Sequence, residues 1–129
     1  MKRAQSALEF MVLIGGVLFF FITFLAALGL NLSTKTFEKQ DAAVEDIALT
    51  IQNEIALATS SSDGYFRSFT LPTQAYDRSY AANLTQGGVV VTTLDHKHST
   101  YLPVFNATGS VVIGANTIRR TQGLVFVNS

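Results

Sequence analysis

Two histidines are the residues of this chain whose types and spacing first suggest chemistry. They lie in Asp95-His96-Lys97-His98, and two imidazoles separated by one residue can bind the same metal ion. Lys97 places a cation between them, and the segment has the composition of a hairpin loop. We therefore predict a solvated turn here, with no bound metal and no other cofactor.

Patterns that would support catalysis are missing from the sequence. It contains no supported Ser/His/Asp arrangement, no HExxH, no glycine-rich phosphate loop and no cysteine. We predict that the protein is not an enzyme. Its basic residues are too few for us to expect a nucleic-acid partner.

Three Asn-x-Ser/Thr sequons are candidate acceptors of N-linked glycans if this part of the chain faces outward. Asn106 falls in a predicted turn and is the best placed, and Asn83 comes next. Asn31 lies on a predicted helix at the edge of an apolar segment, where a glycosylating enzyme would have poor access.

A single carboxylate, Glu9, precedes a long apolar segment. Residues 10–32 carry no charge, and as a helix rising ~1.5 Å per residue they would cover ~34 Å, enough to cross a bilayer core of ~30 Å. Lys2 and Arg3 come before the segment, which predicts a cytoplasmic N-terminus with the remainder of the chain outside. A carboxylate at a membrane edge is costly, and we interpret Glu9 as an assembly residue.

Beyond the apolar segment, a helical pattern continues. Over residues 34–58 apolar side chains recur at spacings of three, four and seven, as on one face of a helix; they are Phe37, Val44, Ile47, Ile51, Ile55 and Ala58. We predict one helix over residues 5–59, with a transmembrane or filament-core part at 10–32 and an amphipathic part at 33–59. A coiled-coil dimer is the alternative for the amphipathic part, although its stripe is short for sustained heptads.

The composition then changes to that of a β domain. Ser and Gly residues end the helix, and short runs rich in Val, Thr, Tyr and Phe follow between turn residues. The predicted fold class is α+β, a long helix followed by a small antiparallel β-sheet head over residues 60–129. Strands are expected at 65–71, 79–85, 89–94, 101–105, 111–113, 117–120 and 124–127, with hairpin turns at 86–88 and 122–123.

Charge is unevenly distributed between these parts. Residues 35–54 hold five carboxylates against two lysines, whereas the head holds five cations against three aspartates. This predicts an attraction between the acidic helix and the basic head, within one subunit or between neighbours. The cations of the head are Arg67, Arg78, Lys97, Arg119 and Arg120.

The N-terminal residues resemble a known export signal. The stretch KRAQSALEF has a basic stub, the small residue Ala4, then Gln5, with Glu9 five residues after Ala4. It is similar to the class III signal peptide of archaeal type IV pilins. Leu13 matches a leucine that the family often carries, and Ala7 departs from the serine of many relatives.

The resemblance implies how such a chain is processed and used. A prepilin peptidase would remove a leader over residues 1–4 on the cytoplasmic side, between Ala4 and Gln5. The apolar helix would then stay on the mature protein, with Glu9 pairing with the new N-terminus at Gln5 of a neighbour. The implied function is that of a structural subunit of an adhesive surface filament. This homo-oligomer would be built by pilus assembly machinery from a single-pass membrane precursor with a pilin-like fold.

Other interpretations of the same residues stay open. The segment could be a cleaved secretory signal peptide, with Ala27-Leu28-Gly29 as a weak cleavage site. It could be an uncut anchor for an extracellular binding module that does not polymerise. A third interpretation is a minor pilin that primes assembly. For Glu9 alone, the alternative is that its negative charge only offsets the positive end of the helix.

Overall fold

The structure is a computed structural model, and it describes residues 2–129. One helix, α1 (Lys2–Thr59), is followed in this part of the chain by seven strands. These are β1 (Phe66–Thr70), β2 (Tyr80–Leu84), β3 (Gly88–Thr93), β4 (Ser99–Pro103), β5 (Ala107–Gly109), β6 (Ala115–Thr121) and β7 (Leu124–Val127). The chain divides into two compact units, Met1–Phe37 and Glu38–Ser129, and the boundary falls within α1.

The first unit is helical and apolar. Its large apolar side chains between Leu8 and Leu32 are each 43–76% exposed. The polar side chains here turn back onto their own helix: the Thr23 hydroxyl donates to the Phe19 carbonyl at 2.8 Å, and Thr34 and Thr36 make the same kind of bond. By length and composition, α1 can cross a membrane.

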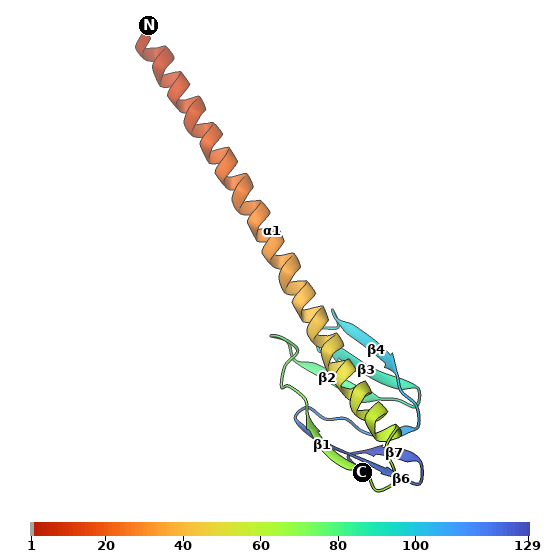
Figure 1. Cartoon of the computed structure of the whole chain (residues 1–129). Helices are drawn as coiled ribbons and strands as arrows, with labels where there is room; N and C mark the ends of the chain where they lie inside the picture. The colour runs from red at the N-terminus through yellow and green to blue at the C-terminus, as the bar shows by residue number, and fades with distance from the viewer. Residues whose placement is uncertain (1) are drawn as a thin grey trace. The chain divides into compact units, whose positions relative to one another are not determined.

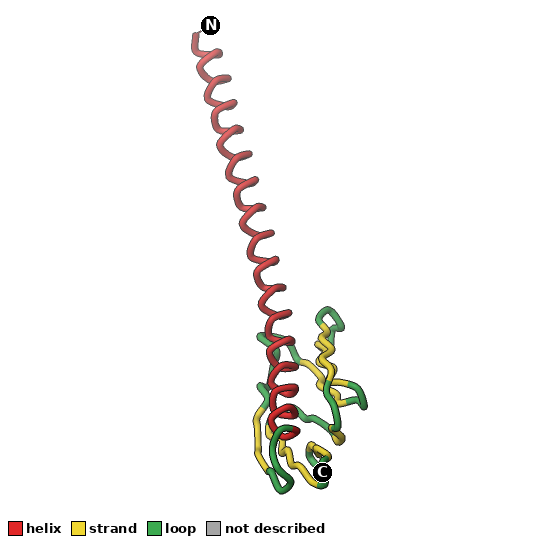
Figure 2. Tube along the Cα trace, turned by 45° about the vertical axis from the view of Figure 1, so that its right-hand side comes forward, coloured by secondary structure: helices red, strands yellow, loops and turns green. Residues whose placement is uncertain are grey.

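The second unit contains two sheets. Three strands form a sheet in the order β2-β3-β4, and four form the other in the order β1-β6-β7-β5. Figures 1 and 2 show strands of both sheets beside the C-terminal part of α1. Neighbouring strands are antiparallel except β5 and β7, which run parallel. The head is therefore mainly antiparallel, as predicted, with one parallel pair that the sequence did not indicate.

The amphipathic part of α1 supplies one side of the core of this unit. Val44, Ile51 and Ala58 are fully buried, and Ile47 and Ile55 nearly so, which confirms the predicted stripe. Their partners in the core come from both sheets and include Tyr80, Val89, Val91, Ile118, Val125 and Val127. One member of the stripe was misjudged, because Phe37 is 50% exposed. The polar Gln40, which lies outside the predicted stripe, is buried.

Six of the seven predicted strands are confirmed, with ends shifted by at most two residues. The strand predicted at 111–113 is wrong, and the fifth strand is β5 at Ala107–Gly109 instead. The reason is Asn116, whose side chain accepts a hydrogen bond from the Val112 amide at 2.9 Å and donates to the Val112 carbonyl at 2.8 Å. Those two backbone groups are the ones that a strand would pair with its neighbour.

The helix α1 ends where it was predicted to end, but the contacts that complete its last turn were not predicted. The helix ends at Thr59, as predicted, but an arginine from β6 completes it: Arg120 donates from Nη1 to the Thr59 carbonyl at 2.6 Å and to the Ser61 carbonyl. Asp63 lies 3.4 Å from Arg120 Nε. Arg120, which the sequence placed among the cations of the basic head, therefore caps the helix.

Candidate functional site

The predicted assembly residues lie together near the start of α1. Gln5 and Glu9 are one helical turn apart, both are exposed, and the Gln5 side-chain amide approaches Glu9 Oε1 at 3.5 Å. The chain folds this way locally because residues four apart share a helix face. The contact seen involves the Gln5 side chain, whereas the predicted pairing involves the backbone amine that cleavage would create.

The predicted cleavage point lies in the first turn of the helix. Ala4 and Gln5 are helical, and Lys2 and Arg3 precede them within α1. The first four backbone amides of a helix have no intrahelical partner, and cations are unfavourable at its positive end. This turn therefore has fewer stabilising backbone interactions than the turns in the middle of the helix.

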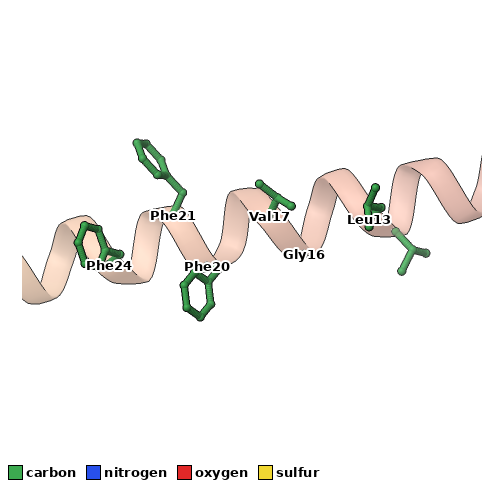
Figure 3. Close-up of a pocket in the computed structure, with 7 residues that line it drawn as sticks. Leu13, Gly16, Val17, Phe20, Phe21 and Phe24 are labelled. Atoms are coloured by element: carbon green, nitrogen blue, oxygen red, sulfur yellow. The ribbon is translucent and has the colours of Figure 1, made fainter.

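An apolar groove follows the carboxylate along the helix. It is lined by Val12, Leu13, Gly16, Val17, Phe20, Phe21 and Phe24. Figure 3 shows Phe20 and Phe21 projecting to different sides of the ribbon, while Gly16 adds no side chain. A Cβ built on Gly16 would meet no atom within 4 Å. Small residues flanked by large apolar ones let a second helix approach closely, so this surface is suited to helix packing.

Only one of the two histidines lies in the solvated turn that the sequence predicted. His96 is exposed, with a φ of 60°, but His98 is 1% exposed, and its prediction was wrong. The positive φ of His96 reverses the chain, and His98 then turns inward to carboxylate and amide groups of α1. Its Nδ1 lies 3.0 Å from Asp41 Oδ1 and its Nε2 lies 3.1 Å from Gln40 Oε1. No pattern of hydrophobicity signals such a contact, because its partners are 57 and 58 residues away.

Residues 2–129 contain no cluster of side chains that would support metal binding. No group of three or more His, Asp and Glu side chains in that part of the chain is arranged to hold an ion. His96 and His98 do not converge, since one is exposed and the other is buried.

Two of the three sequons lie on accessible backbone of the head. Asn106 is exposed in the bend before β5, with a φ of 58°, and Asn83 is exposed on β2, an edge strand. Asn31 lies on α1, and its side-chain amide donates to the Ala27 carbonyl at 3.1 Å. That nitrogen is the one a glycan would occupy, so the geometry agrees with the low rank of Asn31. Glycosylation itself stays a prediction.

The attraction predicted between the acidic helix and the basic head is represented within residues 38–129 by one pair of a helix carboxylate with an arginine of the head. Glu54 of α1 lies 3.5 Å from Arg67 of β1, with the Glu54 side chain 14% exposed. Gln52 adds a hydrogen bond to the Pro103 carbonyl at 2.9 Å. Arg119 instead lies over the Phe126 ring, 5.6 Å from its centre. The electrostatic contacts thus reinforce the packing of α1 on the strands of its own unit.

Two titratable groups of the head have displaced pKa values. The pKa of the Asp95 carboxyl is lowered, first by the Thr93 hydroxyl at 2.6 Å and then by the Lys97 amide at 3.1 Å. Burial raises the pKa of the Tyr80 phenol, which donates to the Pro72 carbonyl at 2.5 Å. Local hydrogen bonds and burial account for the two shifts, so both fit structural roles.

Together these features define a class of protein: an α+β chain with one long apolar N-terminal helix and a small, mainly antiparallel β head, in a pilin-like order of elements. No family model, no curated protein and no solved structure matches the chain.

Proposed function

We propose that this chain is a structural subunit of an archaeal type IV pilus-like surface filament. A prepilin peptidase cuts the membrane precursor between Ala4 and Gln5, and the mature chain polymerises through its apolar helix. The mature filament lies outside the cell and serves adhesion. The resemblance of the leader motif supports the peptidase step and the use in adhesion.

The observation that carries this proposal is the surface of the first unit. Apolar side chains are exposed on it from Leu8 to Leu32, far beyond the few hundred Å² of contiguous apolar surface that a soluble monomer shows. Thr23 and Asn31, two polar side chains within the segment, donate hydrogen bonds to carbonyls of their own helix. Such a surface must be covered by lipid or by other helices, and in the proposed filament it is covered by lipid first and by copies of itself later.

Glu9 gives the helix contacts a register. Within a bundle of apolar helices its carboxylate would leave water, and an unpaired charge there costs several kcal/mol. Its contact with Gln5 at 3.5 Å is too long to compensate for that cost. The ammonium that cleavage creates at Gln5 of a neighbouring subunit supplies the missing positive charge, and it can do so at one relative position of the two helices.

Cleavage and polymerisation can be tested in one preparation. N-terminal sequencing of the native protein should give a chain that begins at Gln5 and forms filaments after detergent is removed. A native chain that begins at Met1 and stays monodisperse would refute the proposal and support an uncut anchor for a binding module. A chain that lacks residues 10–30 would refute it in favour of a secreted protein.

Glu9→Gln tests the assembly step separately. We expect export and cleavage to continue while incorporation into filaments falls at least tenfold, since loss of one partner of a buried pair costs about 3–5 kcal/mol. Glu45→Gln is the matched control, because Glu45 is exposed on α1 outside the apolar segment. Equal incorporation of the two variants would contradict the role given to Glu9.

A further inference from the structure

We propose that His98 is held as a doubly protonated imidazolium in the folded head, and that this proton locks α1 to the turn between β3 and β4. The His98 side chain is 0% exposed, and each of its ring nitrogens faces an oxygen of an α1 side chain. The network lies wholly within residues 38–129, so it does not depend on whether the apolar helix polymerises.

The orientation of Gln40 fixes the role of the first ring nitrogen. Gln40 Nε2 lies 2.7 Å from Asp77 Oδ1, a contact that only a donor can make with a carboxylate. The opposite rotation of the amide would place two acceptor oxygens at that distance. Gln40 Oε1 therefore faces His98 and must accept, so Nε2 of the imidazole carries a proton and donates it across 3.1 Å.

Asp41 fixes the role of the second ring nitrogen. Its Oδ1 lies 3.0 Å from His98 Nδ1, and an ionised carboxylate can only accept. The Asp41 side chain is 61% exposed, so water keeps its ionised form well solvated. Both nitrogens of His98 thus donate at once, which only the imidazolium can do.

The backbone of His98 is held in place by Thr93. The His98 amide donates to the Thr93 hydroxyl at 3.2 Å, and the His98 carbonyl accepts from the Thr93 amide at 2.9 Å. These bonds close the turn on both sides of the residue. The backbone position of His98 is therefore set by β3, while the hydrogen-bond partners of its ring lie on α1.

The charged groups around the ring favour its positive form. On α1 the facing carboxylate is Asp41, and the loop before β2 contributes Asp77, which lies 3.9 Å from Arg78 Nε. The turn itself contributes Asp95, 3.6 Å from Arg78 Nη1, and the cation Lys97. Three carboxylates and two cations therefore surround the ring. Among the ion pairs of residues 2–129, Asp41, the carboxylate that contacts the ring, pairs with neither Arg78 nor Lys97.

Loss of the proton would weaken this junction. A neutral imidazole donates from one nitrogen only, so its other lone pair would face either Gln40 Oε1 or Asp41 Oδ1. Two acceptors in contact repel each other, and the buried ring nitrogen without a proton would have no hydrogen to donate to the oxygen it faces. The contribution of His98 to stability is therefore present while the ring is protonated and is lost as the pH rises.

Nitrogen NMR of the full chain in detergent micelles tests the protonation state directly. With only two histidines in the sequence, His96→Gln assigns the remaining ring signals to His98. At about pH 7, close to the ordinary titration range of imidazole, we expect both His98 nitrogens to show protonated shifts. One lone-pair nitrogen on His98 at that pH would overturn the proposal.

Unfolding measurements test the consequence. Between about pH 6 and about pH 9 the unfolding temperature of wild type should fall by about 5 °C or more. His98→Gln, which has no titratable side chain, should remove this dependence, whereas His96→Gln should keep it. A wild type whose midpoint does not fall over that range, or a His98→Gln variant with the same fall, would overturn the proposal.

Discussion

The packing of α1 against the strands can be tested at Ile51. This side chain is 0% exposed at the centre of the buried stripe of the helix, within the core shared by both sheets. Ile51→Ala would remove three carbon atoms from that core and keep the helix, because alanine is the best helix former. The matched control is Asn53→Ala, since Asn53 lies on the same helix two residues away and is exposed.

The expected magnitude follows from the depth of burial. About 0.8 kcal/mol for each buried methylene gives about 2.4 kcal/mol for three carbons, and the cavity left behind raises the cost to about 3 kcal/mol or more. In a domain of this size, about 3 kcal/mol lowers the unfolding temperature by about 12–24 °C. Asn53→Ala should change it by less than about 4 °C, because exposed substitutions cost about 0.5 kcal/mol at most.

The tyrosines provide a signal specific to this unit. All four tyrosines, at positions 65, 76, 80 and 101, lie within Glu38–Ser129. Near-ultraviolet circular dichroism of the tyrosines therefore reports unfolding of the head in micelles, without interference from the apolar helix. If Ile51→Ala and Asn53→Ala melted at the same temperature, the amphipathic part of α1 could not belong to the core of the head, and the packing described above would be wrong.

Three further outcomes are expected. Gly109→Ala should destabilise the head by about 1–3 kcal/mol more than Gly114→Ala in urea unfolding. Both glycines have positive φ (119° and 97°), but of the two only Gly109 would bring a new Cβ against the Val127 backbone oxygen. Equal costs of the two substitutions would contradict the β5–β7 pairing. Thr93→Val should raise the lowered pKa of Asp95 toward its ordinary range, because the Thr93 hydroxyl is the main cause of the shift. In wild type the stabilisation from the Asp95 carboxylate is present above the ordinary pKa range of aspartate and is lost as the pH falls through the lowered pKa. A carboxyl ¹³C titration of Asp95 that Thr93→Val leaves unchanged would argue against the Thr93 hydroxyl as the cause of the shift. Asn106→Gln should remove a glycan mass from the native protein while Asn31→Gln leaves the mass unchanged, and a native chain without any glycan at residue 106 would contradict the ranking of the sequons.

The sequence by itself determined the local elements. An uninterrupted apolar and then amphipathic pattern predicts the helix to within a residue of its end at Thr59, because helical periodicity is a local property. The turn at Gln122-Gly123 was also readable, and both residues adopt the positive φ (52° and 79°) of a two-residue hairpin. The placement of Gln5 and Glu9 on one helix face follows from their spacing of four residues.

The tertiary structure alone decided the contacts between residues distant in sequence. The parallel pairing of β5 with β7, the clamp of Arg120 on Thr59, and the burial of His98 against Asp41 each join segments that no local pattern connects. An expectation based on residue type alone favours exposure for polar and charged side chains, because it considers each residue without its partners. A buried polar group is stable only when particular partners surround it, and those partners are supplied by the fold as a whole.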